Sequence, residues 1–492
     1  MKKTYIILLL ILLLGLFFRI YKLEIFYSWG HDQDLFAWIA KDILVDYHPR
    51  LIGQETSITG VFIGPLFYYL IALSFAVFKM NPLSAAIVTT TISLFTILSI
   101  YWVFNKFFGL SAGLIGSFLY AVSPGVVFGD RWVVPTQPTP LWTIWYFYVL
   151  FSILNGNLKV LIPLSILVGL IWHVHIAFIP LLILLPVAFL LSEKRDKLRF
   201  SLKSITISLL IFFVLISPFF AFEFRHNFQQ TKSLIGATYQ DRGDLTGLER
   251  LIKVLSSGGR ALVGTFVLSN TAIELEQSFT VTMPFILILI TLYLRFTRIL
   301  NKNQVKLLLV WYLIVFLGQF LSKRIITEYY FSNLIVIFIL ILSLFLNRIN
   351  IFLRKFPLSI IVLSIYLIVV TVWFINKPDD LGGYLYKRQA IEYIKNDVSS
   401  KGYRCIAINH IENQKGGATG FRYLFWLNKL LVVTSGNDVP VYSIVNPWLI
   451  SEKEIKAKFG NIGVIIPAGN KIDPEICYQQ YRQLLPLWGF NN

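Results

Sequence analysis

The stretch Trp29-Gly-His-Asp-Gln-Asp34, continued by Leu-Phe-Ala-Trp-Ile-Ala-Lys-Asp-Ile-Leu44, holds two carboxylates and an imidazole within four residues. It directly follows the first hydrophobic segment of a chain in which only 14% of residues are charged. A soluble protein carries about 25% charged residues. Such a concentration of charge is therefore unusual here, and its meaning depends on which side of a membrane it lies.

The rest of the sequence is apolar enough for a membrane protein. Of its 492 residues, 56% are hydrophobic, and the mean hydropathy is +0.68. The apolar residues gather into runs of roughly 17 to 22, the length that crosses about 30 Å of hydrocarbon as a helix. A buried core helix would explain one such run but not about eleven. The sequence therefore predicts a polytopic α-helical membrane protein.

The charge is strongly positive, with a formal net charge of +18. Most Lys and Arg residues fall between the apolar runs, which indicates topology determination and contact with anionic membrane lipid rather than nucleic acid. The sequence has no Walker loop, no dinucleotide-binding glycine pattern after a strand, no HExxH and no CxxC. We therefore do not expect a reaction driven by ATP or NAD.

The distribution of basic residues predicts the topology. One apolar run, 61–79, decides it: if this run does not cross, all short basic connections lie on the side of the N-terminus, which is then cytoplasmic. We place 61–79 as a juxtamembrane or re-entrant helix in the outer interface, and its Tyr68-Tyr69 pair suits that position. We expect eleven spans and an outer C-terminus, with spans at about 4–20, 83–104, 110–128, 138–154, 158–172, 174–191, 203–222, 279–296, 305–321, 329–346 and 357–375.

The predicted outer side carries the longer polar segments. These are loop 21–82, segment 129–137, the junction 172–175 and loop 223–278, whereas the cytoplasmic connections are short. We therefore expect an integral plasma-membrane protein that works at its outer face. Residues 1–375 form its transmembrane domain.

The tail 376–492 has a different composition, and we expect a small α/β extracytoplasmic domain there. Strands are predicted near 405–409, 431–434 and 463–467, and helices near 390–395 and 452–458. The only two cysteines, Cys405 and Cys477, both lie in this tail. They could pair if the tail is outside the cytoplasm.

The acidic cluster has two readings. Asp32 or Asp34 could be an N-cap at the start of the helix that follows, where a carboxylate favours the positive end of the helix dipole. Either could instead be a general base that removes a proton from an acceptor hydroxyl or amine attacking a sugar carbon. His31 could be a local hydrogen-bond partner or a ligand. A divalent metal is possible but not indicated, because oxygen-rich sites usually need more ligands.

Three further outer sites have weaker signals. Asp130-Arg131 could form local ion pairs, or Arg131 could offer its planar fork to a phosphate. His173 and His175 do not share a helix face, so we do not expect zinc binding by this pair alone, but one of them could donate to a lipid phosphate. Arg324 and Glu328 could be a simple interfacial pair, or they could line a donor site beside Tyr329.

Several motifs, in this order, resemble the GT-C superfamily of polytopic glycosyltransferases, in particular the branch with protein O-mannosyltransferases and the lipid A aminoarabinose transferase. The resemblance covers roughly residues 1–375. It rests on Phe18-Arg-Ile-Tyr, on Trp29–Leu44, on Gly64-Pro-Leu-Phe-Tyr-Tyr-Leu70, on Ser123-Pro with Asp130-Arg131, and on Glu328-Tyr-Tyr-Phe.

The resemblance implies a GT-C type fold, a polyprenyl-phosphate-linked sugar as donor, an extracytoplasmic active site and inversion at the sugar carbon. The family's first-loop aspartate maps onto Asp32, with Asp34 as the second candidate. The donor phosphate would be bound by residues among Arg131, His173, His175, Arg225, Arg242 and Arg324. The substrate would be lined by His31, Tyr68, Tyr69, Glu328 and Tyr329. No cofactor is implied beyond the lipid-linked donor.

The sequence also departs from the family pattern. Gln33 follows Asp32 where the family often has an acidic pair, Thr136 replaces a second Asp, and the family's Thr-Lys falls near His173. The acceptor, whether protein, lipid or glycan, does not carry over. The alternatives are a transporter or flippase for lipid-linked sugars, a polysaccharide ligase or polymerase, and an envelope scaffold. A transporter would carry charges within its spans, and the middles of these spans carry almost none.

Overall fold

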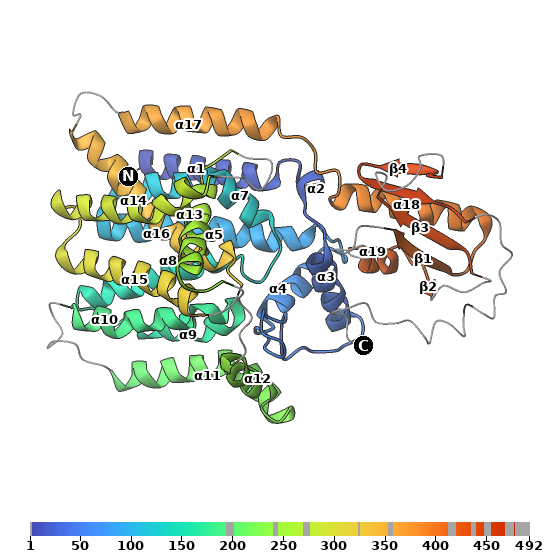
Figure 1. Ribbon diagram of the computed structural model, residues 1–492, viewed down its shortest axis with the longest axis horizontal. Helices are drawn as coiled ribbons and strands as arrows, with labels where there is room; N and C mark the ends of the chain where they lie inside the picture. Colours follow the sequence, from blue (N-terminus) through green and yellow to red (C-terminus); the bar gives the residue numbers. More distant parts are fainter. Residues whose placement is uncertain are drawn as a thin grey trace.

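Helices make up most of the described chain, and a small sheet lies near its C-terminal end (Figure 1). The computed structural model describes residues 2–192, 201–239, 245–268, 276–322, 325–352, 358–411, 420–433, 439–446, 454–467 and 477. The helical part runs through α1 (Lys2–Ile20), α2 (Leu23–Phe26), α3 (His31–Leu44), α4 (Leu66–Val77), α5 (Ser84–Phe108), α6 (Leu110–Val122), α7 (Pro124–Arg131), α8 (Thr139–Leu154), α9 (Leu161–Val174), η1 (Ile176–Ile183), α10 (Leu184–Leu190), α11 (Leu202–Arg225), α12 (Gln229–Tyr239), α13 (Gly247–Gly264), α14 (Gln277–Phe296), α15 (Lys302–Leu321), η3 (Glu328–Phe331), α16 (Ser332–Phe352) and α17 (Leu358–Ile375). The remaining elements are α18 (Tyr384–Lys401), β1 (Ile406–Ile411), α19 (Arg422–Leu427), β2 (Val432–Val433), β3 (Val441–Val445), β4 (Ala457–Phe459) and β5 (Ile462–Ile465).

The helices form the expected polytopic bundle. Among the described residues, seven helices are long and apolar enough to cross a membrane: α1, α5, α11, α14, α15, η3 with α16, and α17. A further candidate is α6 with α7, which are bent by 61° at Ser123. Pro124 explains the bend, because it disfavours the helical conformation in the residue before it. The remaining expected spans coincide with shorter apolar helices, namely α8, α9 and η1 with α10.

The bundle core lies around α8. Its side chains Tyr146, Phe147 and Phe151 are fully buried and pack with Phe104 of α5 and Trp311 of α15. In contrast, α11 and α17 lie on the outside of the bundle (Figure 1) and bury few of their side chains. An apolar helix with an unburied surface suits contact with lipid rather than water.

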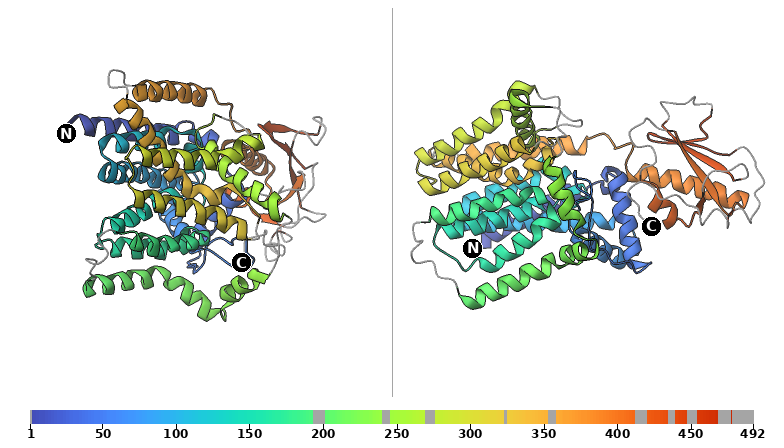
Figure 2. Two further views of the ribbon diagram at one scale, coloured as in Figure 1. Left: turned by 60° about the vertical axis from the view of Figure 1, so that its left-hand side comes forward. Right: turned by 60° about the horizontal axis from the view of Figure 1, so that its bottom comes forward.

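The helices α3 and α4 form a separate layer. They pack against each other at the end of the bundle, between the spanning helices and the C-terminal sheet domain (Figures 1 and 2). The 12-residue α4 lies within the run 61–79, where the sequence predicts a juxtamembrane helix. The first acidic cluster therefore lies where the bundle meets the C-terminal domain.

Loop 223–278, which was expected to be long and polar, contains the helices α12 and α13. One face of α13 is buried against α14, α15 and η3. The contact is close because Gly258 and Gly259 have no side chains: a Cβ at Gly259 would fall 1.8 Å from the carbonyl oxygen of Thr280. The charge of this segment conceals the helix in the sequence, because even its buried face carries a cation: Arg250 is buried and donates to the carbonyl oxygens of Gln319 and Phe320.

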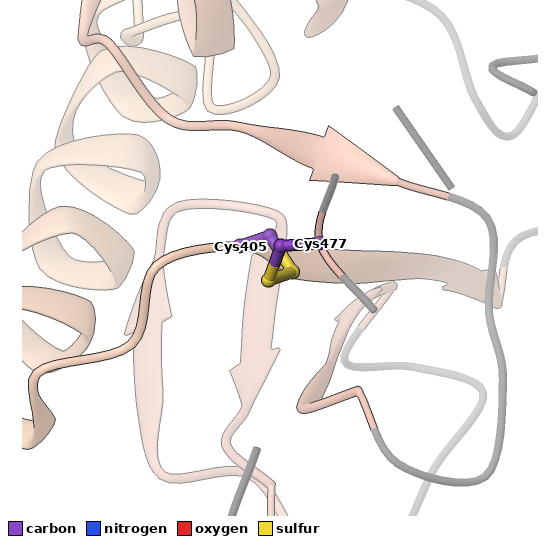
Figure 3. Close-up of a disulfide and its surroundings, with 2 residues drawn as sticks. All are labelled: Cys405 and Cys477. Atoms are coloured by element: carbon purple, nitrogen blue, oxygen red, sulfur yellow. A yellow bond between two sulfur atoms is a disulfide. The ribbon is translucent and has the colours of Figure 1, made fainter. Parts of the chain in front are cut away.

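The described residues of the C-terminal part form a five-stranded sheet in the order β2-β1-β3-β5-β4, with α18 packed against β4 and β5. The strand β1 pairs in parallel with β2 and β3, whereas β5 pairs antiparallel with β3 and β4. Cys405 and Cys477 form a disulfide with Cα atoms 5.7 Å apart (Figure 3). The helix predicted near 452–458 is wrong for the residues described there, because Ala457–Phe459 pairs with β5 as a strand.

Candidate active site

The helix α3 begins at His31, Gly30 is its N-cap residue, and the side chain of Gln33 caps the backbone there. The Gln33 side-chain oxygen accepts a hydrogen bond from the backbone N–H of Gly30 at 3.0 Å, and the side-chain amide donates to the carbonyl of Val133 at 3.0 Å. Asp32 and Asp34 lie inside the first turn, where their charges favour the helix dipole. Neither is the N-cap residue, so both carboxylates are available for other contacts.

Asp34 ties α3 to the C-terminal domain. Its side chain is buried, and its two oxygens accept hydrogen bonds from the backbone N–H groups of Arg422 and Tyr423, at 3.1 and 2.9 Å. Burial raises the pKa of Asp34 to about 7, against the lowering effect of these hydrogen bonds. Both oxygens of Asp34 therefore accept hydrogen bonds within the protein, and Asp34 helps to hold the C-terminal domain against α3.

Asp32 faces a different part of the molecule, as residues two apart on a helix do. Its carboxylate accepts a hydrogen bond from the side-chain amide of Gln54 at 3.3 Å. Burial raises the pKa of Asp32, opposed by the nearby His31 and by the Gln54 hydrogen bond. Asp32 also lies close enough to Tyr68 to raise the pKa of that phenol, although burial of Tyr68 is the larger cause. The structure thus groups Asp32 with His31 and Tyr68.

Gln54 is placed by a short hairpin, residues 53–63, that the sequence did not predict. Backbone hydrogen bonds join Gly53 to Ile63, Ile63 to Gln54 and Thr56 to Val61. A Cβ at Gly53 would fall 2.6 Å from the carbonyl oxygen of Gly64, so the two hairpin arms need glycine there. The hairpin reaches from Asp32, through Gln54, to Tyr330 of η3, through Ser57.

A groove of about 270 Å³ lies at the tip of this hairpin. We call it the outer groove. Its walls come from the hairpin, from the start of η1, from α12, from the end of α15 and from η3. It is lined by Thr56, Ser57, Ile58, His175, Ile176, Ala177, Pro180, Leu234, Gln319, Ser322 and Tyr330.

His175 and Tyr330 are the central polar groups of the outer groove. The Nδ1 atom of His175 accepts a hydrogen bond from the backbone N–H of Ala177 at 3.0 Å, so the proton of the neutral ring lies on Nε2. The ring packs against Tyr329 and Tyr330, with centroids 5.6 and 5.5 Å away. The Tyr330 hydroxyl lies 3.3 Å from the Ser57 hydroxyl. The imidazole N–H and the hydroxyl proton that the Ser57–Tyr330 hydrogen bond leaves over can donate to an anion there.

The other predicted residues on this side have separate partners. Glu328 pairs with Arg260 of α13 at 3.1 Å, and the Tyr69 hydroxyl bonds the backbone of Arg50. His173 bridges three helices instead of facing the outer groove: its Nδ1 accepts from Leu66 N at 3.4 Å and its Nε2 lies 2.8 Å from Leu215 O. Arg225 is exposed at the end of α11, and Arg242 and Arg324 lie outside the described residues.

Asp130 and Arg131 do not pair with each other. Asp130 forms an ion pair with Arg19, with an Nε–Oδ2 distance of 3.0 Å, and both side chains are buried. Arg131 donates to the carbonyl oxygens of Phe18 and Tyr21 at 2.5 and 2.7 Å. It lines a second cavity that shares no residue with the outer groove. The sequence predicted no role for Arg19; a lone cation at the end of the first span is the signal that could have indicated a buried partner.

Comparisons with known proteins agree with this architecture. The family described as dolichyl-phosphate-mannose-protein mannosyltransferase matches residues 63–222. ArnT from Cupriavidus metallidurans, bound to undecaprenyl phosphate, is similar over 96% of this chain and 99% of its own, with 10% identity and a TM-score of 0.59. The Archaeoglobus fulgidus oligosaccharyltransferase, in a complex with Zn and sulfate, is similar over 89% of this chain and 68% of its own, with 13% identity and a TM-score of 0.50.

A comparison with curated protein sequences found no match. Because the sequence identities are only 10% and 13%, the similar structures show that the fold is shared and nothing more. The matched residues run from α4 to most of α11 and include one wall of the outer groove, the start of η1. Over residues 63–222 the chain is therefore similar to a family of mannosyltransferases, and its fold is similar to the folds of ArnT and of the oligosaccharyltransferase.

Proposed function

We propose that this protein transfers a sugar from a polyprenyl-phosphate donor to an acceptor at the outer face of the membrane, with inversion and with Asp32 as general base. The environment of Asp32 carries this proposal. Asp34 and Asp130 are occupied by backbone amides and by Arg19, whereas Asp32 accepts from the neutral amide of Gln54. A carboxylate with a raised pKa holds a proton more strongly and is a better base.

The outer groove is the proposed site of the donor phosphate. The Nε2–H of His175 and the hydroxyl groups of Ser57 and Tyr330 converge there. Hydrogen bonds aimed at the phosphate would stabilise the charge that it gains as it leaves. The similar ArnT structure contains undecaprenyl phosphate, which supports a lipid phosphate as the leaving group. The hairpin 53–63 connects this groove to Asp32 through Gln54.

The reaction needs only these elements. The acceptor oxygen or nitrogen attacks the anomeric carbon from the face opposite the phosphate, and Asp32 takes the proton that the acceptor loses. The bond between the sugar and the phosphate oxygen breaks, and the polyprenyl phosphate leaves with the electron pair. The energy of the glycosyl phosphate bond drives transfer, so no step requires ATP or a redox cofactor.

Two observations support an outer active site. The basic connections between the predicted spans favour a cytoplasmic N-terminus. The disulfide between Cys405 and Cys477 is typical of a compartment outside the cytoplasm. Because Asp34 joins α3 to the domain that carries this disulfide, Asp32 would lie on the same side of the membrane.

The Asp32→Asn variant tests the proposal. Purified protein in liposomes would be given radiolabelled polyprenyl-phosphate sugars together with a membrane extract as acceptor, and release of sugar from the lipid would be measured. We expect the variant to lose about 10²- to 10⁴-fold in turnover, the usual contribution of a general base. The matched control is Asp46→Asn, the same change at an exposed turn just after α3, which should retain activity.

Two outcomes would contradict the proposal. Normal turnover in Asp32→Asn, with wild-type folding and insertion, would exclude Asp32 as the base. Movement of the intact sugar-lipid across the membrane without cleavage would favour the flippase alternative instead.

A further inference from the structure

The second cavity shares no lining residue with the outer groove. It has a volume of about 700 Å³ and lies where α7 and the connection from α17 to α18 meet the C-terminal domain. In Figure 1 this connection passes beside α2, on the side of the molecule away from α11 and α12. We call it the upper cavity; it is lined by Phe26, Ser28, Phe128, Gly129, Arg131, Trp132, Lys377, Pro378, Asp379, Asp380, Leu381 and Asn461.

Arg131 is the buried cation of the upper cavity. Its side chain is only 3% exposed. One nitrogen, Nη2, donates to the carbonyl oxygens of Phe18 and Tyr21, but Nε and Nη1 are buried with no hydrogen-bond partner among the described residues. A buried donor without a partner is costly, and the cost is larger for a charged group. The guanidinium therefore lacks an acceptor in the chain as described.

Lys377 is the second cation of the cavity. Its ammonium lies 3.6 Å from the ring centroid of Phe128. Burial and the nearby charge of Arg131 lower the pKa of Lys377, and Asp380 partly opposes them. Two cations close enough to repel each other are stabilised by an anion between them.

The two aspartates of the cavity do not supply that anion. Asp379 pairs with Lys22 at 3.5 Å, and Asp380 accepts a hydrogen bond from the backbone N–H of Gly382 at 3.2 Å. Among the described residues, neither Arg131 nor Lys377 has a carboxylate within ion-pair distance. The positive charge of the cavity is thus available to a ligand.

The position of the cavity relative to the membrane points to the source of the ligand. Lys377 follows the end of the membrane-spanning helix α17 by two residues, and α17 exposes Ile365, Ile368 and Val372. Trp132, another lining residue, is 47% exposed. Indole rings and cations next to the end of an apolar helix are typical of the lipid headgroup level.

We propose that the upper cavity binds the phosphate of an anionic phospholipid headgroup between Arg131 and Lys377. Guanidinium and ammonium groups both bind phosphate through short, charge-assisted hydrogen bonds. The bound lipid would link α7 of the bundle to the α17–α18 connection. It would also stabilise the C-terminal domain, because Leu381 of that connection accepts a hydrogen bond from the backbone N–H of Asn461 at 2.9 Å. This site does not depend on Asp32 or on the outer groove.

Native mass spectrometry of the full-length protein in detergent would test the proposal. Phosphatidylglycerol would be titrated into wild-type protein and into Lys377→Gln, with diacylglycerol as the lipid without phosphate. We expect one phosphatidylglycerol to bind the wild type, no retained diacylglycerol, and about ten-fold weaker binding in Lys377→Gln, the effect of one charge-assisted contact. The control is Lys395→Gln, at an exposed position on α18, which should bind like the wild type.

Thermal unfolding with added lipid gives a second measurement. Phosphatidylglycerol should raise the Tm of the wild type and of Lys395→Gln more than that of Lys377→Gln. Equal lipid binding by wild type and Lys377→Gln would overturn the proposal. An equal rise of the wild-type Tm with inorganic phosphate, lost in Lys377→Gln, would identify a soluble phosphate and overturn the lipid assignment. Sugar transfer does not enter these readouts, so their outcome is separate from that of the Asp32→Asn experiment.

Discussion

The ion pair between Arg19 and Asp130 gives the sharpest stability prediction. Both side chains are buried, at 0% and 3% exposed. The guanidinium of Arg19 donates to Asp130 and to the carbonyl oxygens of Gly15 and Ala121, at 2.9 and 3.0 Å. The other Asp130 oxygen accepts from Tyr120 at 3.2 Å and from Gln137 at 3.0 Å. This network joins α1, α6 and α7 to the loop before α8.

Removing one partner of the Arg19–Asp130 ion pair should strongly lower the free energy of unfolding. The variant Asp130→Ala leaves the Arg19 charge buried without its counter-ion and leaves Tyr120 and Gln137 without their acceptor. Breaking a buried pair in this way costs about 3–5 kcal/mol. Asp130→Asn keeps an acceptor for Tyr120 and should cost less. Replacing both partners with apolar residues, as Arg19→Met with Asp130→Leu, removes the buried charges together and should cost less than either single change to an apolar residue.

The assay is a double-mutant cycle on the free energy of unfolding in mixed detergent micelles. We expect a coupling energy of about 2 kcal/mol or more between the two positions, at the upper end of the range for residues in one network. A cost below about 1 kcal/mol for Asp130→Ala, or additive effects in the double variant, would refute the reasoning. A surface pair is the matched control: Lys401 and Asp397, one helical turn apart on α18, should couple by less than about 1 kcal/mol.

Two further predictions concern the C-terminal domain. Because burial raises the pKa of Asp34 to about 7 from 3.8, the folded protein holds this proton more tightly than the unfolded chain does. The stabilisation is therefore complete below about pH 4 and is lost as the pH rises toward 7. We expect Tm to depend less on pH in Asp34→Asn than in the wild type across this range, and identical pH profiles would contradict this. The disulfide closes a segment with a sequence separation of 72 residues, so Cys405→Ala should destabilise the domain by about 4 kcal/mol on the chain-entropy model. Limited proteolysis should then cleave the domain faster in Cys405→Ala than in the wild type; unchanged resistance would show that the bridge does not stabilise it.

The sequence by itself determined the class of this protein. Apolar runs of membrane-spanning length predict the bundle, because a chain in hydrocarbon must satisfy its backbone hydrogen bonds within helices. The helix α13 is the exception: its charged residues make the segment resemble a polar loop in the sequence. Val254, Gly258 and Leu262 recur at helical spacing on its buried face, but Arg250 on the same face and the charged residues nearby hid the pattern.

Local preference also failed where tertiary pairing decided the structure. The segment near 452–458 is rich in Lys and Glu, which favour a helix, yet Ala457–Phe459 is a strand because β5 offers an antiparallel partner. Strand formation depends on neighbours more than helix formation does.

The roles of the charged residues depended on the tertiary structure for the same reason. Asp32 and Asp34 are chemically identical and two residues apart. Only the fold places Asp34 against backbone N–H groups 388 and 389 residues away and Asp32 beside Gln54. Likewise, Asp130 pairs with Arg19, 111 residues earlier in the chain, whereas the neighbouring Arg131 lines the upper cavity. The sequence determined which ionisable groups lie near the ends of the helices. Packing decided which of them have partners within the protein, because a side chain's partners come from segments that only the fold brings together.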